Sequence, residues 1–267
     1  MFNARILGTS KVSILLFTLL VTFSQAQDDT PPRPRPELQE TIDQNAPAVW
    51  NFKEYDEISK STVRIVVSLN RGGKVTQAHG SGVIISRLEE KHPTIEGMTR
   101  GYIVTCAHVT PKNDTLAIVI EYQNGMTSEA QILETNSVTD VALLRAWIPV
   151  EYTVIAPATI RPVYSDIVFC CGYGQLYNCK KPRYFECKVF RSSPLIISLL
   201  EDAVPGDSGG PIFNEEGKLV GLISQGRTAF QTKGSTIYTG PASGPSVLAI
   251  KQLISVYLTR SLSGIND

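Results

Sequence analysis

The sequence predicts an all-β fold, and three observations support this prediction. From Ser61 onward, short runs rich in β-branched residues alternate with turn signals. The segments "NRGGK", "YQNGMTS" and "NEEGK" separate such runs and have the composition of hairpin turns or loops. The runs also follow one another at close spacing, which is typical of a β-barrel or a β-sandwich.

The expected elements follow from this pattern in chain order. The predicted strands are "STVRIVVSL", "GSGVIIS", "GYIVTCAHV", "TLAIVIEY", "EAQILE", "DVALLRA", "DIVFCCGYG", "KVFRSS", "LIISLL", "GPIFN" and "KLVGLIS". A convincing helix is expected only at the C-terminal end, in "SVLAIKQLISVYLTRSL". Its predicted apolar face, at three- and four-residue steps, is Val247, Ile250, Ile254, Leu258 and Leu262.

Residues 1–26 have the features of a signal peptide. Arg5 and Lys11 precede an apolar run over residues 12–23, and small residues end the segment. The run is short for a membrane span, which favours a cleaved signal, with an uncleaved anchor as the alternative. We therefore expect a mature protein from about Gln27 that is soluble, secreted or periplasmic, and free of the membrane after cleavage.

The rest of the composition is that of one globular domain with extensions. The 267 residues are 42% hydrophobic and 19% charged, enough for a substantial core. Residues 27–54, which include "DDTPPRPRPELQE", predict a Pro-rich linker or N-terminal extension. The folded domain is expected over residues 55–267. Lys plus Arg and Asp plus Glu are 25 each, and no basic stripe indicates nucleic acid as a partner.

The five cysteines are consistent with export, which permits disulfides. Their odd number leaves at least one thiol unpaired or intermolecular. Cys179 and Cys187 flank a short polar loop and are the first candidates for a bridge, whereas Cys106 lies in an apolar strand and is a candidate buried thiol. No cysteine or histidine pair has zinc-ligand spacing, so we predict neither a metal nor another cofactor.

The chain contains three histidines, which narrows the choice of a general base. His92 lies in a polar loop and is expected to be solvated, and His79 can be an ordinary strand-edge side chain. His108 follows an apolar strand at the start of a turn. Asp140 precedes a buried strand, where a carboxylate needs a hydrogen-bond donor such as an imidazole N–H. The alternative is an exposed turn aspartate that caps the strand.

The segment "GDSGGP" is the most specific signal in the chain. Composition alone would produce it in only about one in 10⁴ to 10⁵ such chains. Glycines on both sides of Ser208 allow backbone N–H groups to point inward together, and Gly206 and Ser208 are the candidate oxyanion-hole donors. The segment also fits the G-x-S-x-G elbow of α/β-hydrolases. No histidine follows Ser208, which excludes that class.

The order His108, Asp140, Ser208 is that of chymotrypsin-type enzymes. Together with "GSGVIIS", "GYIVTCAHV", "TDVALLR" and "PGDSGGPIF", it makes the chain resemble trypsin-like serine peptidases over about residues 58–260. The motif spacing is closest to the HtrA-like branch, although no PDZ-sized segment follows. The resemblance implies a double six-stranded antiparallel β-barrel of the chymotrypsin type with a C-terminal helix.

The resemblance also implies the catalytic roles. His108 would be the general base, Asp140 the acid that orients it, and Ser208 the nucleophile that forms an acyl-enzyme. Nothing in the chain resembles the "IVGG" amino terminus that pairs with the acid before the serine in pancreatic enzymes. Asp207 is therefore expected to have another partner or to be exposed.

The resemblance also suggests which residues form the specificity pocket. Counting back from Ser208 places Asp202 where trypsin has the acid that selects Arg or Lys, unless this loop differs and Asp202 is solvated. Thr236 aligns with a glycine of the pocket wall and could favour small residues instead. Ser224 and Gly226 are expected to line the pocket entrance.

Two functions from different classes remain. The first is an exported serine endopeptidase that acts on proteins or peptides, which the complete triad favours. The second is a non-catalytic peptide- or protein-binding module built on a peptidase fold. The oligomeric state stays open.

Overall fold

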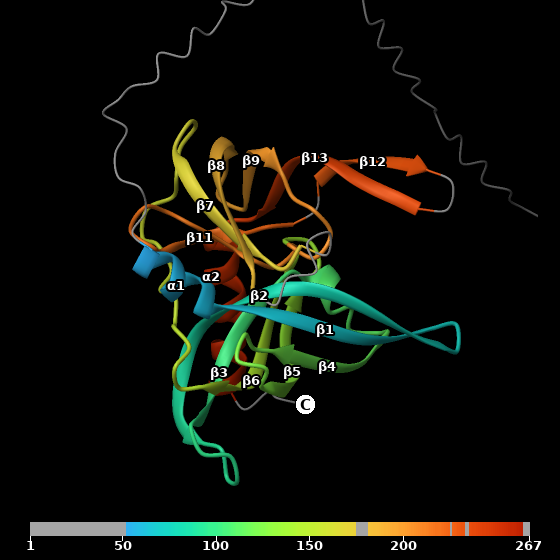
Figure 1. Ribbon diagram of the computed structural model, residues 1–267, viewed down its shortest axis with the longest axis vertical. Helices are drawn as coiled ribbons and strands as arrows, with labels where there is room; N and C mark the ends of the chain where they lie inside the picture. Colours follow the sequence, from blue (N-terminus) through green and yellow to red (C-terminus); the bar gives the residue numbers. More distant parts are fainter. Residues whose placement is uncertain (1–51, 175–180, 225, 233–234, 264–267) are drawn as a thin grey trace, which may run out of the picture. The chain divides into compact units, whose positions relative to one another are not determined.

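The computed structural model describes residues 52–174, 181–224, 226–232 and 235–263 (Figure 1). The predicted signal peptide and nearly all of the predicted linker lie outside the described residues. Within the described residues, no helix combines the length and the apolar character that crossing a membrane requires.

The first half of the domain is a closed antiparallel barrel with the strand order β1-β2-β3-β6-β5-β4 (Figure 1). Its strands are β1 (Thr62–Arg71), β2 (Lys74–Lys91), β3 (Met98–Thr105), β4 (Thr115–Glu121), β5 (Thr127–Asn136) and β6 (Val141–Pro149). The predicted "NRGGK" and "YQNGMTS" turns are confirmed, because they join β1 to β2 and β4 to β5.

Strand β1 shows why this sequence forms a barrel. Alternate side chains of a strand point to one face, and in β1 the inward face is apolar and almost fully buried. Gly72 and Gly73 follow with φ angles of 60° and 81°, the left-handed values that a tight two-residue hairpin turn needs. The turn sets the register, in which Arg71 faces Lys74.

The second half contains β7 (Ile167–Gly172), β8 (Arg183–Ser192), β9 (Ile196–Asp202), β10 (Pro211–Phe213), β11 (Leu219–Leu222), β12 (Gly226–Thr232) and β13 (Ser235–Pro245). They form one sheet with the order β11-β10-β7-β8-β9-β13-β12. An antiparallel bridge from Gly221 to Ser246 and a hydrogen bond from Ser224 N to Ser243 O bring the end of β13 back to β11. Six strands thus curl into a second barrel, and β12 is an additional hairpin arm.

The predicted fold class, an all-β chymotrypsin-like double barrel with a C-terminal helix, is therefore confirmed. The hairpin of β12 and β13 was not among the expected strands. Its sequence over residues 226–245 is rich in Gly, Thr and Ser and lacks a long β-branched run, so the usual strand signal is weak there.

The C-terminal helix α2 spans Val247–Leu262, as predicted, and Ser246 caps it by accepting a hydrogen bond from Ala249 N. Its buried face agrees with the predicted one in part. Val247, Ala249, Ile250 and Leu253 are buried, and Ile254 and Tyr257 pack against the core while partly exposed. The last turns lie at the surface, where Leu258 is 48% and Leu262 is 88% exposed.

The expectation of a single helix is wrong, because α1 (Phe52–Ser61) precedes β1. Phe52, Tyr55 and Ile58 recur at three-residue steps, but three apolar residues in a short and mostly polar stretch are a weak helix signal. Tertiary contacts stabilise it: Ile58 is buried, and the Tyr55 ring meets the edge of Tyr184 at 5.3 Å. The folded domain therefore starts slightly before the predicted boundary at residue 55.

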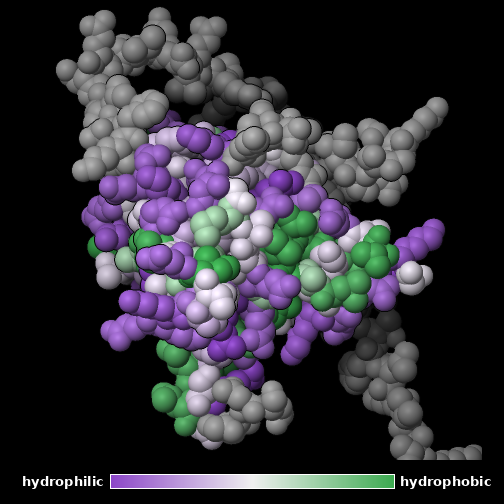
Figure 2. All heavy atoms as spheres, turned by 60° about the horizontal axis from the view of Figure 1, so that its bottom comes forward, coloured by the Kyte–Doolittle hydropathy of each residue, from purple (hydrophilic) through white to green (hydrophobic). Residues whose placement is uncertain are grey.

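A shared hydrophobic core joins the two halves. Phe169 and Phe213 of the second half stack at 6.0 Å and belong to the same buried cluster as Ile65 and Leu144 of the first barrel. Polar side chains cover most of the face seen in Figure 2, with smaller hydrophobic patches between them. The two halves therefore pack on one hydrophobic core, which fixes the position of one half relative to the other.

The cysteines of the described part lie in two hydrophobic clusters: Cys106 and Cys171 in the shared core, and Cys170 and Cys187 in a second cluster of the second half. Cys106, Cys170, Cys171 and Cys187 are buried free thiols, which confirms the expectation for Cys106. Cys187 Sγ lies 3.5 Å from Cys170 Sγ. Cys179 lies outside the described residues, so the Cys179–Cys187 bridge stays a prediction.

Candidate active site

His108 is held at the end of a rigid strand. Strand β3 ends at Thr105, Cys106 continues in extended conformation, and residues Ala107–Val109 form a short 3₁₀ turn. Ala107 and Val109 are buried and anchor the turn, while the His108 side chain stays 32% exposed. The backbone of His108 is therefore held in place, while its imidazole ring stays accessible to solvent.

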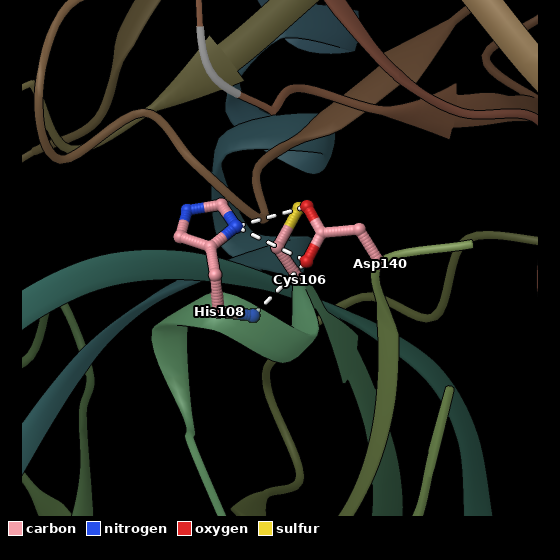
Figure 3. Close-up of side chains that lie close together, drawn as sticks. All are labelled: Cys106, His108 and Asp140. Carbon is pink, nitrogen blue, oxygen red and sulfur yellow. Dashed lines mark hydrogen bonds and ion pairs between the residues drawn. The ribbon is translucent and has the colours of Figure 1, made fainter. Parts of the chain in front are cut away.

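His108 and Asp140 lie in direct contact, and Figure 3 shows the imidazole Nδ1 facing the carboxylate. Nδ1 is 2.9 Å from Oδ2 and 3.1 Å from Oδ1 of Asp140, and the His108 backbone N–H donates to Oδ1 at 3.0 Å. Asp140 has a φ of 55°, a left-handed conformation that aspartate tolerates better than most residues. The carboxylate thus orients the ring so that Nε2 faces away from it.

Ser224 adds a further hydrogen bond to this carboxylate. Its Oγ donates to Asp140 Oδ2 at 2.8 Å. Burial works to raise the pKa of Asp140, but the hydrogen bonds from His108 and Ser224, with the attraction of His108, outweigh burial and lower that pKa. Asp140 is therefore an ionised acceptor near neutral pH. Ser224 thus contacts Asp140, and its place at the pocket entrance stays a prediction.

The loop that carries Ser208 is fixed by backbone hydrogen bonds to the first barrel. Ser81 N donates to Ser208 O at 2.8 Å, and Ser81 Oγ donates to Gly206 O at 2.7 Å. Gly206 and Gly209 have φ angles of 100° and 86°, which glycine adopts without strain. A Cβ atom at Gly209 would lie only 2.1 Å from Thr105 Oγ1, so the close approach requires a glycine.

Two backbone N–H groups of this loop remain available. In the part of the chain that the structure describes, neither the Gly206 nor the Ser208 N–H donates a hydrogen bond. Among the same residues, no hydrogen bond joins Ser208 Oγ to His108. The serine–histidine contact often tightens only when substrate is bound, so its absence leaves both residues as candidates.

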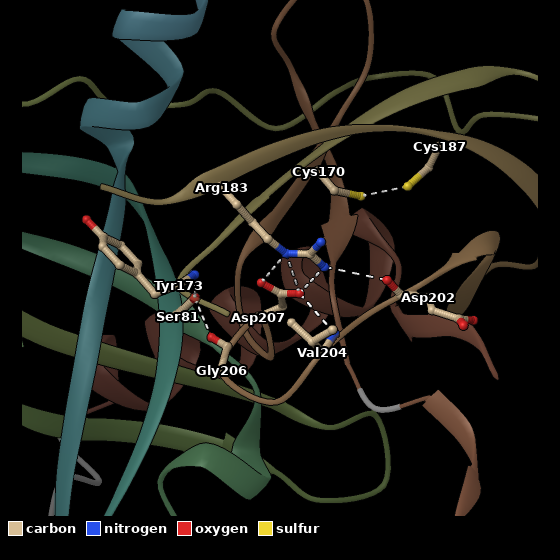
Figure 4. Close-up of polar contacts among 9 residues, drawn as sticks. All are labelled: Ser81, Cys170, Tyr173, Arg183, Cys187, Asp202, Val204, Gly206 and Asp207. Atoms are coloured by element: carbon tan, nitrogen blue, oxygen red, sulfur yellow. Dashed lines mark hydrogen bonds and ion pairs between the residues drawn. The ribbon is translucent and has the colours of Figure 1, made fainter. Parts of the chain in front are cut away.

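Asp207, next to the serine, is fully buried and forms an ion pair with Arg183 at the start of β8 (Figure 4). Arg183 Nε donates to both carboxylate oxygens at 3.0 Å, and a terminal nitrogen of its guanidinium also donates to Oδ2. Val204 N donates to Oδ2 at 3.0 Å. Of the two alternatives expected for Asp207, a partner other than an amino terminus is therefore confirmed, and exposure is not. The ion pair with Arg183 stabilises the turn that leads to Ser208.

Sequence reasoning missed Arg183. A buried aspartate requires a donor, but the arginine lies 24 residues away on another strand, and no motif marks it. Its guanidinium also lies over the Phe185 ring, at 3.9 Å from the centroid, which helps to hold it in place.

The predicted pocket residues are spread along three strands or loops. Asp202 is exposed at the end of β9, and Figure 4 shows its carboxylate pointing away from Arg183, which approaches its backbone oxygen at 3.5 Å. Gly226 begins β12, and Thr236 pairs with Gln231 in the β12–β13 ladder. The Thr236 side chain lies outside the described part, so the pocket and its preference stay predictions.

The other two histidines make contacts elsewhere. His92 is half-buried with its ring 4.6 Å from that of Trp147, so the expectation of a solvated side chain is wrong. His79 lies on β2 with Nδ1 at 3.3 Å from an Arg64 guanidinium nitrogen. Of the three, His108 alone contacts Asp140 among the described residues.

Comparison with known proteins defines the class of this domain. Residues 80–222, more than half of the chain, match the trypsin-like peptidase domain, and the chain belongs to this family. The predicted resemblance to trypsin-like peptidases is thus confirmed, and it supports a serine peptidase.

Solved structures of other proteins show the same fold. The chain is similar to the serine endoprotease from Yersinia pestis, with 22% sequence identity and a TM-score of 0.57 over 81% of this chain and 69% of that one. At this identity the likeness concerns the fold alone. A search of curated proteins found no match.

Proposed function

We propose that this protein is an exported serine endopeptidase that hydrolyses peptide bonds through an acyl-enzyme. The contact of His108 Nδ1 with Asp140, beside the glycine-framed loop of Ser208, is the observation that carries the proposal. The predicted signal peptide supports export to a secreted or periplasmic location, and the family supports a protein or peptide substrate.

The residues can perform each step of this reaction. Asp140 keeps the proton of His108 on Nδ1, so Nε2 is free to accept the proton of Ser208 as its oxygen attacks the carbonyl carbon. The N–H groups of Gly206 and Ser208 stabilise the oxyanion. His108 then protonates the departing amine, and water hydrolyses the acyl-enzyme by the same route in reverse.

Arg183 supports an active loop that needs no liberated amino terminus. A cation beside Asp207 stabilises the turn from Val204 to Ser208, and here the chain supplies that cation from β8. Because the pair is internal, assembly of the oxyanion loop does not depend on where the N-terminal segment is cut.

Cleavage of a peptide library tests the proposal. We expect turnover by the wild-type protein and a fall of about five to six orders of magnitude in the Ser208→Ala and His108→Ala variants. His92→Ala is the matched control, because it removes a histidine that contacts Trp147 and should retain turnover.

A binding module is the second candidate. The described residues show no hydrogen bond between Ser208 Oγ and His108, which is compatible with this alternative as well as with an enzyme that has no substrate bound. Peptide binding without turnover by the folded wild-type protein would support this alternative and overturn the first.

A further inference from the structure

Two of the catalytic candidates and a neighbouring cysteine bring three different donor atoms together. Cys106 Sγ, His108 Nδ1 and a carboxylate oxygen of Asp140 all lie within 4.8 Å of one another (Figure 3). Sequence spacing did not reveal this group. Its third member lies 32 residues beyond the histidine and reaches it only through the fold.

The donor types match one cation class. Thiolate, imidazole and carboxylate are the protein ligands that Zn²⁺ prefers, usually in tetrahedral geometry. Two nitrogen or oxygen ligands at about 2.1 Å from a tetrahedral metal lie about 3.4 Å apart. His108 Nδ1 and the Asp140 oxygens are 2.9 and 3.1 Å apart, so these two ligands need to separate by only a few tenths of an ångström, and Cys106 Sγ lies within 4.8 Å of both.

The surroundings allow an ion to arrive and to complete its coordination. A surface pocket of about 430 Å³ is lined in part by Ala107, His108 and Asp140, which gives access to one side of the group. Ser224 Oγ, 2.8 Å from Asp140 Oδ2, or a water can occupy a fourth position. Two features of Cys106 disfavour metal binding. Its side chain is fully buried, and its thiol donates a hydrogen bond to Ile223 O at 3.2 Å that must break when a metal binds.

We propose that Cys106, His108 and Asp140 form a Zn²⁺ site that holds the domain in an inactive state. On binding, the Cys106 thiol releases one proton to solvent, and the proton on His108 Nδ1 moves to Nε2. The histidine then carries its proton on the atom that must accept one from Ser208. The inhibitory effect rests on the proposed peptidase function, whereas binding itself does not.

The binding test uses Co²⁺ as a spectroscopic probe on the Ser208→Ala variant, which cannot digest itself. We expect one Co²⁺ per chain with a thiolate-to-metal absorption band, and Zn²⁺ should displace it. Cys106→Ala and the near-isosteric Cys106→Ser, each in the Ser208→Ala background, should lose the band. Cys170→Ala, which removes another buried thiol, should keep it. A band that persists without Cys106, or no band in the parent, overturns the site.

The inhibition test uses the full chain, ZnCl₂ and a cleavable peptide, with each variant compared to its own zinc-free rate. Wild-type cleavage should stop on Zn²⁺ addition and return with a chelator. The Cys106→Ser variant loses one ligand, so half-maximal inhibition should require a Zn²⁺ concentration at least about tenfold higher than for the wild type. Equal sensitivity of both proteins contradicts the inhibitory role. If the zinc-free protein cleaves nothing while the cobalt band is present, the peptidase proposal fails and the metal site stands.

Discussion

Arg183 and Asp207 form a buried ion pair that fixes the residue immediately before Ser208. The arginine donates through Nε to both oxygens of a carboxylate that is wholly inaccessible to solvent. The same carboxylate accepts the Val204 N–H, so the turn before the serine is built around it. The pair therefore links strand β8 to the candidate oxyanion loop.

Replacing Arg183 by Met should destabilise the protein and lower its activity. Removal of one partner leaves a buried charge unpaired, which costs about 3–5 kcal/mol. If the loop shifts, loss of an oxyanion donor should lower kcat by about 10²–10³-fold. Denaturant unfolding and steady-state kinetics measure both effects. Arg64→Met is the matched control, since its pair with Glu121 is much more accessible to solvent than that of Arg183 with Asp207 and should contribute about 1 kcal/mol or less.

The double variant Arg183→Met with Asp207→Asn separates stability from positioning. Because the double variant has no unpaired buried charge, its free energy of unfolding should be higher than that of Arg183→Met alone. Its kcat should stay low, because the loop before Ser208 has lost the ion pair that positions it. Full recovery of kcat would show that Arg183 stabilises the fold without positioning the loop.

Asp140→Asn should impair catalysis while leaving the fold intact. An amide can donate to Nδ1 and thereby stabilise the wrong tautomer of His108, so kcat should fall by about 10⁴-fold. Peptide hydrolysis and thermal unfolding of the variant test this. Asp166→Asn, in an exposed turn, serves as the control and should match the wild type. Normal turnover by Asp140→Asn would remove Asp140 from the mechanism.

Gly209→Ala should be far more damaging than Gly73→Ala, although both glycines have positive φ angles of 86° and 81°. A Cβ at Gly209 would lie 2.2 Å from Ser81 O, while nothing lies within 4 Å of one at Gly73. We expect a loss of about 3 kcal/mol or more at Gly209, against about 1 kcal/mol at Gly73. Equal free energies of unfolding for the two variants would contradict the tight packing of the Ser208 loop.

Cys170 and Cys171 should resist alkylation in the native protein. Burial raises the pKa of the Cys171 thiol to about 12 and also raises that of Cys170. A raised pKa keeps the thiol protonated, so only about one Cys171 in 10⁴ is ionised at pH 8. Mass spectrometry after iodoacetamide treatment should find both unmodified at pH 8 and modified after denaturation. Rapid native labelling would show that this part of the core opens readily.

The sequence was sufficient for the fold class and for the His108–Asp140 contact. Both depend on local signals: β-branched runs between turns, and motifs whose chain order is specific to one class. The helix α2 was predictable as an element and its buried face only in part, since Val247 and Ile250 are buried as predicted whereas Leu258 and Leu262 are exposed. Periodicity defines an apolar stripe, whereas the neighbours decide how many turns are covered, and Leu262 lies past them.

Contacts that no motif marks could not be predicted in the same way. Arg183 meets Asp207, and Cys106 lies near Asp140, because the fold brings together residues that are far apart in the sequence. Asp202 is a second example. Counting back from Ser208 assumed that the loop before the serine has the same path as in trypsin, and the Asp202 side chain is exposed. Helix α1 was missed because its stability comes from Tyr55 and Ile58 packing on the domain.

Covalent labelling by a fluorophosphonate tests the central claim most directly, because the probe reacts only with a serine that its own site activates. The account predicts one adduct per chain, mapped by mass spectrometry to Ser208, in the zinc-free wild-type protein. His108→Ala should lose the adduct, and His92→Ala should keep it. A folded wild-type protein in which Ser208 stays unlabelled would contradict the assignment of Ser208 as the nucleophile.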